Sequence, residues 1–486
     1  MGNEHRRSRT TERQLILALI LIFLACGVLF IFVAQQTTRA PMLTPFLAFG
    51  IAEMIATWGS ALVEAHATDD ISAALLTAGC FVVFIIAFVV ASAILRLRRN
   101  EAKAFRDAQI GGESTTRRYG WALWTMAGIL IALGTFLYRG LPPILNSLDA
   151  VLSPGDNPED VLRINETRRD LTKGYVFGEA EYRGQGVLRI VLSRGWGYLA
   201  IFSIAAYLLR GSRSRRASLR LPWQPIAITL MGMIYVGGTG VRAPIVIHIV
   251  AVIIGLSMMV RFSMRSLAGG ASVIALVIFV VAPLGGETES RGTAQDRASN
   301  AAQRVFLGNG SNNILIMQAI ENGAITQGWG RLHVEQLQAA LPGVSGNAPF
   351  SNRLSQMRGG KRAETSYASP TYFGVLYADF GAIGTLAGYG LIGVFVAYAQ
   401  RWLFRRKKDV PNLALVGSII VVLSQLSVSG FSGVAVGILV IVAFHFVVTH
   451  LVLLTNRNAR GRHSMTLERE FSRTPLPNRQ ITEFVP

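Results

Sequence analysis

The chain has 486 residues, of which 51% are hydrophobic and only 15% are charged. Soluble domains carry about 25% charged residues, so the composition argues against a soluble enzyme. The net charge of +19 would suggest nucleic-acid binding in a soluble protein. In a membrane protein the same excess marks cytoplasmic loops, and we expect no nucleic-acid partner.

Apolar stretches of a length that suits a bilayer crossing recur along the chain. A transmembrane helix needs roughly 20 predominantly apolar residues. The stretches predict an all-α polytopic integral membrane protein with roughly 10–11 transmembrane helices and two large extracytoplasmic loops containing short helices. The predicted spans are 15–34, 43–63, 73–95, 119–138, 187–209, 221–240, 243–260, 267–285, 371–400, 411–429 and 431–454.

Clusters of basic residues between the spans orient them. Such clusters favour the cytoplasmic side, and they lie in 96–118, 210–220, 261–265, 401–408 and 457–462. Neighbouring clusters are separated by an even number of predicted crossings, so all of them can share one side. The chain then divides into N-terminal transmembrane helices (1–138), a first large outer loop (139–186), central transmembrane helices (187–286), a second large outer loop (287–370), C-terminal transmembrane helices (371–455) and a disordered cytoplasmic tail (456–486).

The N-terminus does not fit this scheme directly. Its four arginines favour the cytoplasm, yet three spans before residue 96 would place them outside. Either the segment 43–63, which contains Pro45 and Glu53, is re-entrant, or the N-terminus is exported despite its charge. Both alternatives remain open from the sequence. The four residues are Arg6, Arg7, Arg9 and Arg13.

A glycine-rich turn at 237–244 joins two predicted spans on the outer side. Its glycines permit a tight reversal, and Pro244 suits the first turn of the following helix. The free N–H groups of that helix and the Arg242 guanidinium would bind an anion such as a lipid diphosphate. The alternative is a plain hairpin whose arginine reaches phospholipid headgroups.

Basic residues in the predicted outer loops run against the positive-inside tendency and need a reason. Arginine forks match phosphate oxygens, although salt bridges to neighbouring acids are the alternative. Arg189 and Arg194 are harder to explain by surface ion pairs, because they lie in or beside the next span. The phosphate- and glycan-binding candidates in the loops are Arg168, Arg169, Lys173, Arg183, Arg291 and Arg297.

The end of the second loop carries candidates for acid–base chemistry. A carboxylate or imidazole at the membrane surface could deprotonate a sugar hydroxyl, which makes Glu364, His333 and Asp379 candidate catalytic residues. Tyr372, beside them in the sequence, is a candidate for substrate contact. For each catalytic candidate a structural role is the alternative, and Asp379 could instead cap a helix dipole.

Three stretches together resemble bacterial O-antigen polymerases, which join oligosaccharide repeat units and are related to O-antigen ligases. The stretch 369–384 (SPTYFGVLYADFGAIG) resembles the family's late-span signature. The stretch 330–342 (GRLHVEQLQAALP) is similar to its glycine-led outer-loop segment, and 240–244 (GVRAP) resembles its arginine turn. The ligases place His-Asn where this chain has Pro370 and Thr371, which favours the polymerases.

The resemblance implies a GT-C-type, inverting, metal-independent glycosyltransferase in the bacterial cytoplasmic (inner) membrane, with its active site facing outside. Its donor and acceptor would be polyprenyl-diphosphate-linked oligosaccharides among membrane lipids, with a chain-length regulator and a flippase as further partners. Outer arginines, Arg242 above all, would hold the diphosphate while a base activates the acceptor hydroxyl. No cofactor or metal is expected, because Cys26 and Cys80 lie in apolar segments. A glycan ligase and a lipid-linked oligosaccharide flippase or transporter are the alternatives.

Overall fold

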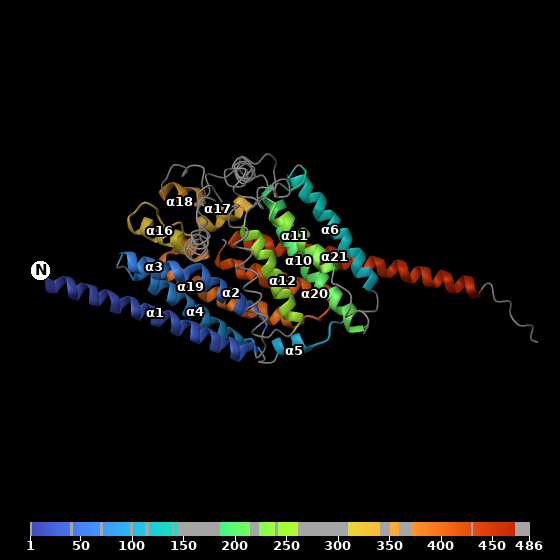
Figure 1. Cartoon of the computed structure of the whole chain (residues 1–486), viewed down its shortest axis with the longest axis horizontal. Helices are drawn as coiled ribbons and strands as arrows, with labels where there is room; N and C mark the ends of the chain where they lie inside the picture. Colours follow the sequence, from blue (N-terminus) through green and yellow to red (C-terminus); the bar gives the residue numbers. More distant parts are fainter. Residues whose placement is uncertain are drawn as a thin grey trace, which may run out of the picture.

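The described part of the chain is a bundle of helices (Figure 1). The computed structural model describes residues 2–38, 42–68, 71–97, 101–111, 116–138, 140–142, 185–213, 223–238, 242–260, 310–340, 350–358, 371–428 and 431–471. Every named element within these ranges is a helix, which confirms the all-α prediction for this part of the chain.

The long helices coincide with the predicted spans. Within the described ranges, eight are long and apolar enough to cross a membrane, and α11 and α12 are shorter apolar helices. The chain is therefore a multi-pass membrane protein; the predicted span 267–285 lies outside the described residues. These eight long and two shorter apolar segments are α1 (Gly2–Thr38), α2 (Pro45–Glu53) with η1 (Met54–Trp58) and α3 (Gly59–Thr68), α4 (Ser72–Ile94), α6 (Thr116–Tyr138), α10 (Gln185–Arg213), α11 (Trp223–Val236), α12 (Arg242–Met259), α19 (Tyr372–Phe404), α20 (Val410–Ser424) with η5 (Gln425–Ser427), and α21 (Phe431–Phe471).

The segment that the sequence left ambiguous forms one continuous rod. Thr44 caps the start of α2 through a hydrogen bond from the Leu47 N–H, and helix then continues through η1 into α3 without a reversal. The five residues of η1 form a π-helix, a local widening that is rare and frequent at functional sites. The structure therefore supports a crossing over Pro45–Ala65 and not a re-entrant loop.

The short helix α5 (Glu101–Asp107) marks one end of the bundle. Arg405 donates to Glu101 over 3.2 Å, and Lys408 donates to the main-chain oxygen of Arg106. The Gly111 N–H donates to the Lys408 carbonyl over 2.7 Å. The basic segments 96–118 and 401–408 therefore meet at the same end, as their shared charge predicted.

The beginning of α1 lies at the other end of the bundle. Residues near the C-terminal end of α1 line a cavity together with Glu101 of α5. The C-terminal end of α1 therefore lies near α5, and its N-terminal end lies far from α5 (Figure 1). This polarity matches the alternative in which all three of the first segments cross. The basic N-terminal residues consequently lie opposite the α5 end.

Close helix packing builds the core. The pair α4 and α19 makes extensive contact, because Gly393 lets the helices approach until an added Cβ would lie 2.5 Å from the Phe84 carbonyl oxygen. Small residues at such interfaces are typical of membrane helices. Phe46 stacks on Phe84 and Phe88 beside this contact. Among the eight candidate spans, the one formed by α20 is the most deeply enclosed, because 94% of its residues are buried.

Short helices cover the end opposite α5. These are α16 (Gly310–Glu321), α17 (Arg331–Ala340) and α18 (Phe350–Arg358), and all fall in the predicted second outer loop. A small core of their own, containing Ile316, Leu332 and Leu354, packs on Val375 and Ala378 of α19. The predicted short helices of this segment are therefore present. The first outer loop, from residue 143 to 184, lies outside the described residues.

The C-terminal end differs from expectation. Helix α21 continues to Phe471, so its last part falls within 456–486, which we predicted to be disordered. The prediction relied on polar composition and on prolines, and the prolines of this segment, Pro475, Pro477 and Pro486, all lie beyond the helix end.

Candidate functional site

A break in α19 positions the candidate site at the end opposite α5. Gly381 has φ 66° and ψ −166°, which divides α19 into a short first part, Tyr372–Phe380, and a long second part. A positive φ of this kind favours glycine. In addition, a Cβ added at Gly381 would lie only 2.7 Å from the amide nitrogen of Gln327. Asp379 consequently lies at the end of the first part, where it faces α17.

The Asp379 carboxylate caps a helix other than its own. Its Oδ1 accepts the N–H of Leu332 over 3.0 Å, and its Oδ2 accepts the N–H of His333 over 3.1 Å. These N–H groups belong to the first turn of α17 and have no partner within that helix. A carboxylate at this position also complements the helix dipole. The predicted cap role is therefore present, but it serves α17.

The loop before α17 pairs with the same end of the first part of α19. The N–H groups of Gly328 and Trp329 donate to the carbonyl oxygens of Ala378 and Asp379, over 3.0 and 2.9 Å. An added Cβ on Gly328 would lie 2.3 Å from Asp379 Oδ1. The loop thus approaches the carboxylate so closely that only glycine fits.

His333 completes the arrangement. Its Nδ1 lies 2.5 Å from Asp379 Oδ2. A carboxylate can only accept hydrogen bonds, so we assign the ring proton to Nδ1, and the neutral ring then keeps a lone pair on Nε2. The His333 side chain is 19% exposed, whereas Asp379 is fully buried. Of the two, only the histidine can meet a molecule from outside.

Aromatic side chains hold the imidazole and continue to the surface. The rings of Tyr372 and Phe380 have centroids 5.7 Å from that of His333, and Tyr372 stands edge-on at 86°. Phe380 is partly exposed, and Trp329 and Ile383 are exposed by 79% and 83%. Exposed tryptophan is typical of the membrane–water interface. His333 therefore lies beside an exposed apolar surface.

Charged residues on α17 and α18 lie at the same end. Glu335 accepts from Arg331 and from Arg353, each over 2.9 Å, so two arginines share one carboxylate. Beside His333 the two guanidinium groups are therefore balanced by the carboxylates of Glu335 and Asp379. The i,i+4 spacing of Arg331 and Glu335 is visible in the sequence, but the approach of Arg353 requires the tertiary fold.

Three of the predicted site residues come together: His333, Asp379 and Tyr372. Arg242 begins α12, and the end of the preceding helix α11 lies at the end of α6, where the Tyr138 hydroxyl donates to the Tyr235 carbonyl over 2.7 Å. The Arg242 side chain is outside the described part of the structure. The remaining predicted residues lie outside the described ranges: Glu364, Arg168, Arg169, Lys173, Arg183, Arg291 and Arg297.

Arg194 is a half-buried cation in α10 whose Nε is buried. Its Nε has no hydrogen-bond partner among the described residues, and it faces α21, where it lies 3.0 Å from the position of a Cβ on Gly437. Arg194 lies about 14 Å along α10 from the helix start at Gln185, at 1.5 Å per residue. A guanidinium at this depth is costly without a counter-charge.

Glu53 is a buried carboxylate in the middle of the bundle. Tyr389 donates to its Oε1 over 2.5 Å, while its Oε2 has no hydrogen-bond partner in the described part of the chain. Both residues are almost fully buried, and Glu53 directly precedes the π-helix η1. Ionisable residues inside membranes are usually functional. From the sequence, Glu53 stands out only as a charged residue within a predicted crossing.

No family model, curated protein or solved structure matches the chain. Within the described ranges there is also no group of three or more side chains that could hold a metal ion. The functional interpretation therefore depends on the geometry of the residues themselves.

Proposed function

We propose that the chain is a membrane glycosyltransferase that polymerises polyprenyl-diphosphate-linked oligosaccharide repeat units, with His333 as its general base. The observation that carries the proposal is the His333–Asp379 pair, in which a buried carboxylate holds a partly exposed imidazole at the end of the bundle opposite α5. An imidazole oriented through Nδ1 presents Nε2 as a proton acceptor, which is how histidine bases are commonly arranged.

In this mechanism Nε2 takes the proton of an acceptor sugar hydroxyl. The hydroxyl oxygen forms a bond to the anomeric carbon of the donor glycan, while the bond from that carbon to the diphosphate oxygen breaks. The electron pair leaves with the polyprenyl diphosphate, and the configuration inverts. Asp379 would act as a positioning residue, because it is fully buried and its hydrogen bonds go to α17.

Cationic groups would hold the diphosphate leaving group. Arg242 is our first candidate, since α11 ends and α12 begins at the end of the bundle away from α5. Arg331 and Arg353, which share Glu335, would add positive charge near His333. The loop residues named from the sequence remain candidates for the same role.

The basic residues at the α5 end support an orientation of the bundle across the membrane. Because basic loops favour the cytoplasm, the α5 end with Arg405 and Lys408 would lie inside, and His333 would lie outside. A lipid-linked substrate in the outer leaflet of the bacterial cytoplasmic membrane would reach the site along the exposed surface of Phe380 and Ile383.

The test is an assay of polymer growth in nanodiscs. Purified protein is incubated with a lipid-diphosphate-linked repeat unit, and the products are separated on a gel. We expect a ladder from the native protein and, for His333→Ala, a rate lower by at least about 100-fold, as is typical for loss of a general base. His450→Ala is the matched control, because His450 is an exposed histidine of α21 away from this pair. A ladder that forms equally fast with His333→Ala would refute the base assignment.

Transport of the same lipid-linked glycan is a second candidate function, and Glu53 is the observation that favours it. A buried carboxylate with one unpartnered oxygen in the bundle core is what a proton- or ion-coupled transporter would use. Transport without a ladder, lost in Glu53→Gln, would favour this function. Transfer of whole glycan to an acceptor without lengthening would instead indicate a ligase.

A further inference from the structure

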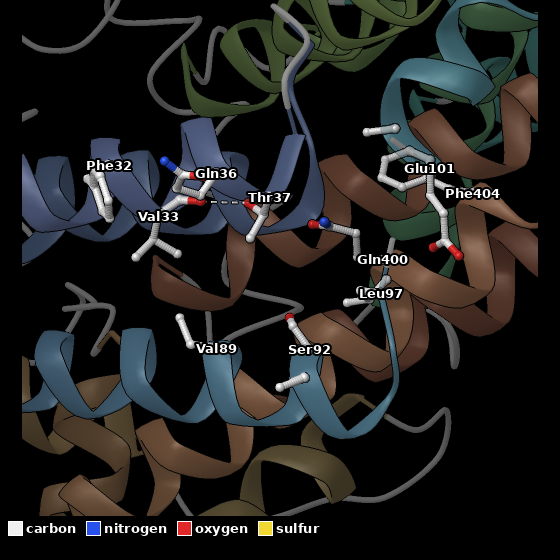
Figure 2. A pocket seen from close by; sticks show the side chains of 12 residues that line it. Phe32, Val33, Gln36, Thr37, Val89, Ser92, Leu97, Glu101, Gln400 and Phe404 are labelled. Carbon is white, nitrogen blue, oxygen red and sulfur yellow. Dashed lines mark hydrogen bonds between the residues drawn. The ribbon is translucent and has the colours of Figure 1, made fainter. Parts of the chain in front are cut away.

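A cavity opens between α1, α4 and α19 beside α5, at the end of the bundle away from His333 (Figure 2). Its volume is about 320 Å³, which lies at the lower end of the range for small-molecule sites. One part of its wall is apolar. Phe32 and Val89 belong to this part and are 56% and 41% exposed on the outer surface of the bundle. Both lie on membrane helices, so the mouth of the cavity faces lipid.

The other part of the wall is polar and incompletely satisfied. Figure 2 shows the Ser92 hydroxyl and the Gln400 amide directed into the space between α1 and α4. Ser92 Oγ, Gln400 Oε1 and Glu101 Oε2 are buried and have no hydrogen-bond partner among the described residues. Ser92 and Gln400 are only 8% and 3% exposed. Buried polar atoms are nearly always paired in native proteins, so these atoms indicate a missing partner.

The chemistry of the unpaired atoms restricts that partner. Gln400 Oε1 and Glu101 Oε2 can only accept hydrogen bonds, so the partner must donate them. The carboxylate favours a cationic donor. The other oxygen of Glu101 binds Arg405, whose side chain is 49% exposed and has further N–H groups for an anion. A ligand with an ammonium, a phosphate and an apolar chain matches all of these features.

We propose that this cavity binds a phospholipid of the phosphatidylethanolamine class from the surrounding bilayer. Its ammonium lies at Glu101, its phosphate at Arg405, its glycerol and ester groups at Ser92 and Gln400, and one acyl chain against Phe32 and Val89. The site would fasten α1 to α4 and α19 at the α5 end. It does not depend on the proposed glycosyltransferase activity, because the cavity and His333 lie at opposite ends of the bundle.

The experiment measures lipid retained by the purified full chain. Protein in nanodiscs of equimolar phosphatidylethanolamine, phosphatidylglycerol and phosphatidylcholine is transferred to mild detergent, washed, and analysed by native mass spectrometry. We expect about one phosphatidylethanolamine per chain, with a preference of about tenfold over phosphatidylcholine, whose trimethylated headgroup has no N–H to donate. This comparison uses only the native protein, so it does not depend on the folding of a variant.

Two variants test the residues. Glu101→Gln keeps the shape and an acceptor but removes the charge, and it should lower the preference for phosphatidylethanolamine over phosphatidylglycerol by about tenfold. Glu321→Gln, a change at an exposed glutamate on α16, is the matched control and should leave the preference unchanged. Retention of no lipid, equal retention of all three headgroups, or an unchanged preference in Glu101→Gln would each overturn the proposal.

Discussion

Asp379 accepts three hydrogen bonds at one end of the bundle, whereas Glu53, in its core, accepts one side-chain hydrogen bond from Tyr389. Both carboxylates are buried, and both belong to membrane helices. The partner of Asp379 reaches the surface, while the partner of Glu53 is itself 1% exposed. The first arrangement orients a reactive group toward a substrate, and the second leaves a polar oxygen inside the bundle.

The sharpest test of this difference replaces each carboxylate by its amide. In Asp379→Asn the negative charge that stabilises the protonated imidazole is lost, and the amide NH2 must face an N–H donor, either that of Leu332 or those of His333. We expect kcat for polymerisation to fall by about 1,000-fold with little change in KM, since Asp379 does not touch the substrate.

Glu53→Gln is the matched variant in the core. A glutamine still accepts from Tyr389, and we expect polymerisation to change by less than about threefold. Steady-state kinetics of both variants in nanodiscs gives the comparison. Equal losses in the two variants would mean that the carboxylates serve one common function, and the distinction between them would fail.

A smaller effect is expected where the loop meets Asp379. Gly328→Ala would place a methyl group 2.3 Å from Asp379 Oδ1 and force the loop away from the cap of α17. We expect a loss of about 1–3 kcal/mol in the free energy of local unfolding, measured by hydrogen exchange of the α17 amides. Gly128→Ala in α6 is the control, because nothing lies within 4 Å of its added Cβ. Unchanged protection of α17 in Gly328→Ala would contradict the close approach.

The corresponding change in the core removes the donor to Glu53. Tyr389→Phe removes the hydroxyl that donates to Glu53 Oε1, while Oε2 already lacks a partner among the described residues, and loss of such a buried hydrogen bond costs about 1–3 kcal/mol. Thermal unfolding in detergent should therefore occur at a lower temperature than for the native chain. Tyr398→Phe, at a residue that is 58% exposed, removes a hydroxyl of the same helix and should have almost no effect. A similar shift for both variants would show that the Tyr389 hydroxyl has no special role.

The sequence predicts the region around Asp379 far better than the region around Glu53, and the reason is physical. Apolar runs predict the membrane helices, and the motif around Asp379 marks the end of the second loop as a candidate site. Neither signal shows that Asp379 caps a helix 47 positions earlier, or that Tyr389 meets Glu53 across 336 positions. Such contacts depend on how helices pack, and the break at Gly381 that turns Asp379 toward α17 has no periodic signature.

The smallest effect concerns the α5 end, where a cation is held by main-chain oxygen. Burial lowers the pKa of Lys408 from 10.5 to about 8, and its ammonium donates to the Arg106 carbonyl. Because the pKa is lower in the folded state, the unfolded chain binds the proton more tightly. The free-energy cost of burying the protonated ammonium is fully present below pH 8 and decreases as the pH rises from 8 toward 10.5. The free energy of unfolding should therefore increase with pH in that range.

Lys408→Gln isolates this contribution from that of other groups that titrate in the same range. The amide keeps a hydrogen-bond donor for the Arg106 carbonyl but has no proton to release. Between pH 7.5 and 10.5, the native chain should gain about 1–2 kcal/mol relative to the variant in denaturant unfolding. Parallel curves for the two proteins would mean that the Lys408 ammonium is as well solvated in the folded chain as in the unfolded one. The α5 end would then tolerate its basic residues through hydration, and not through the carbonyl and carboxylate partners that distinguish it from the His333 end.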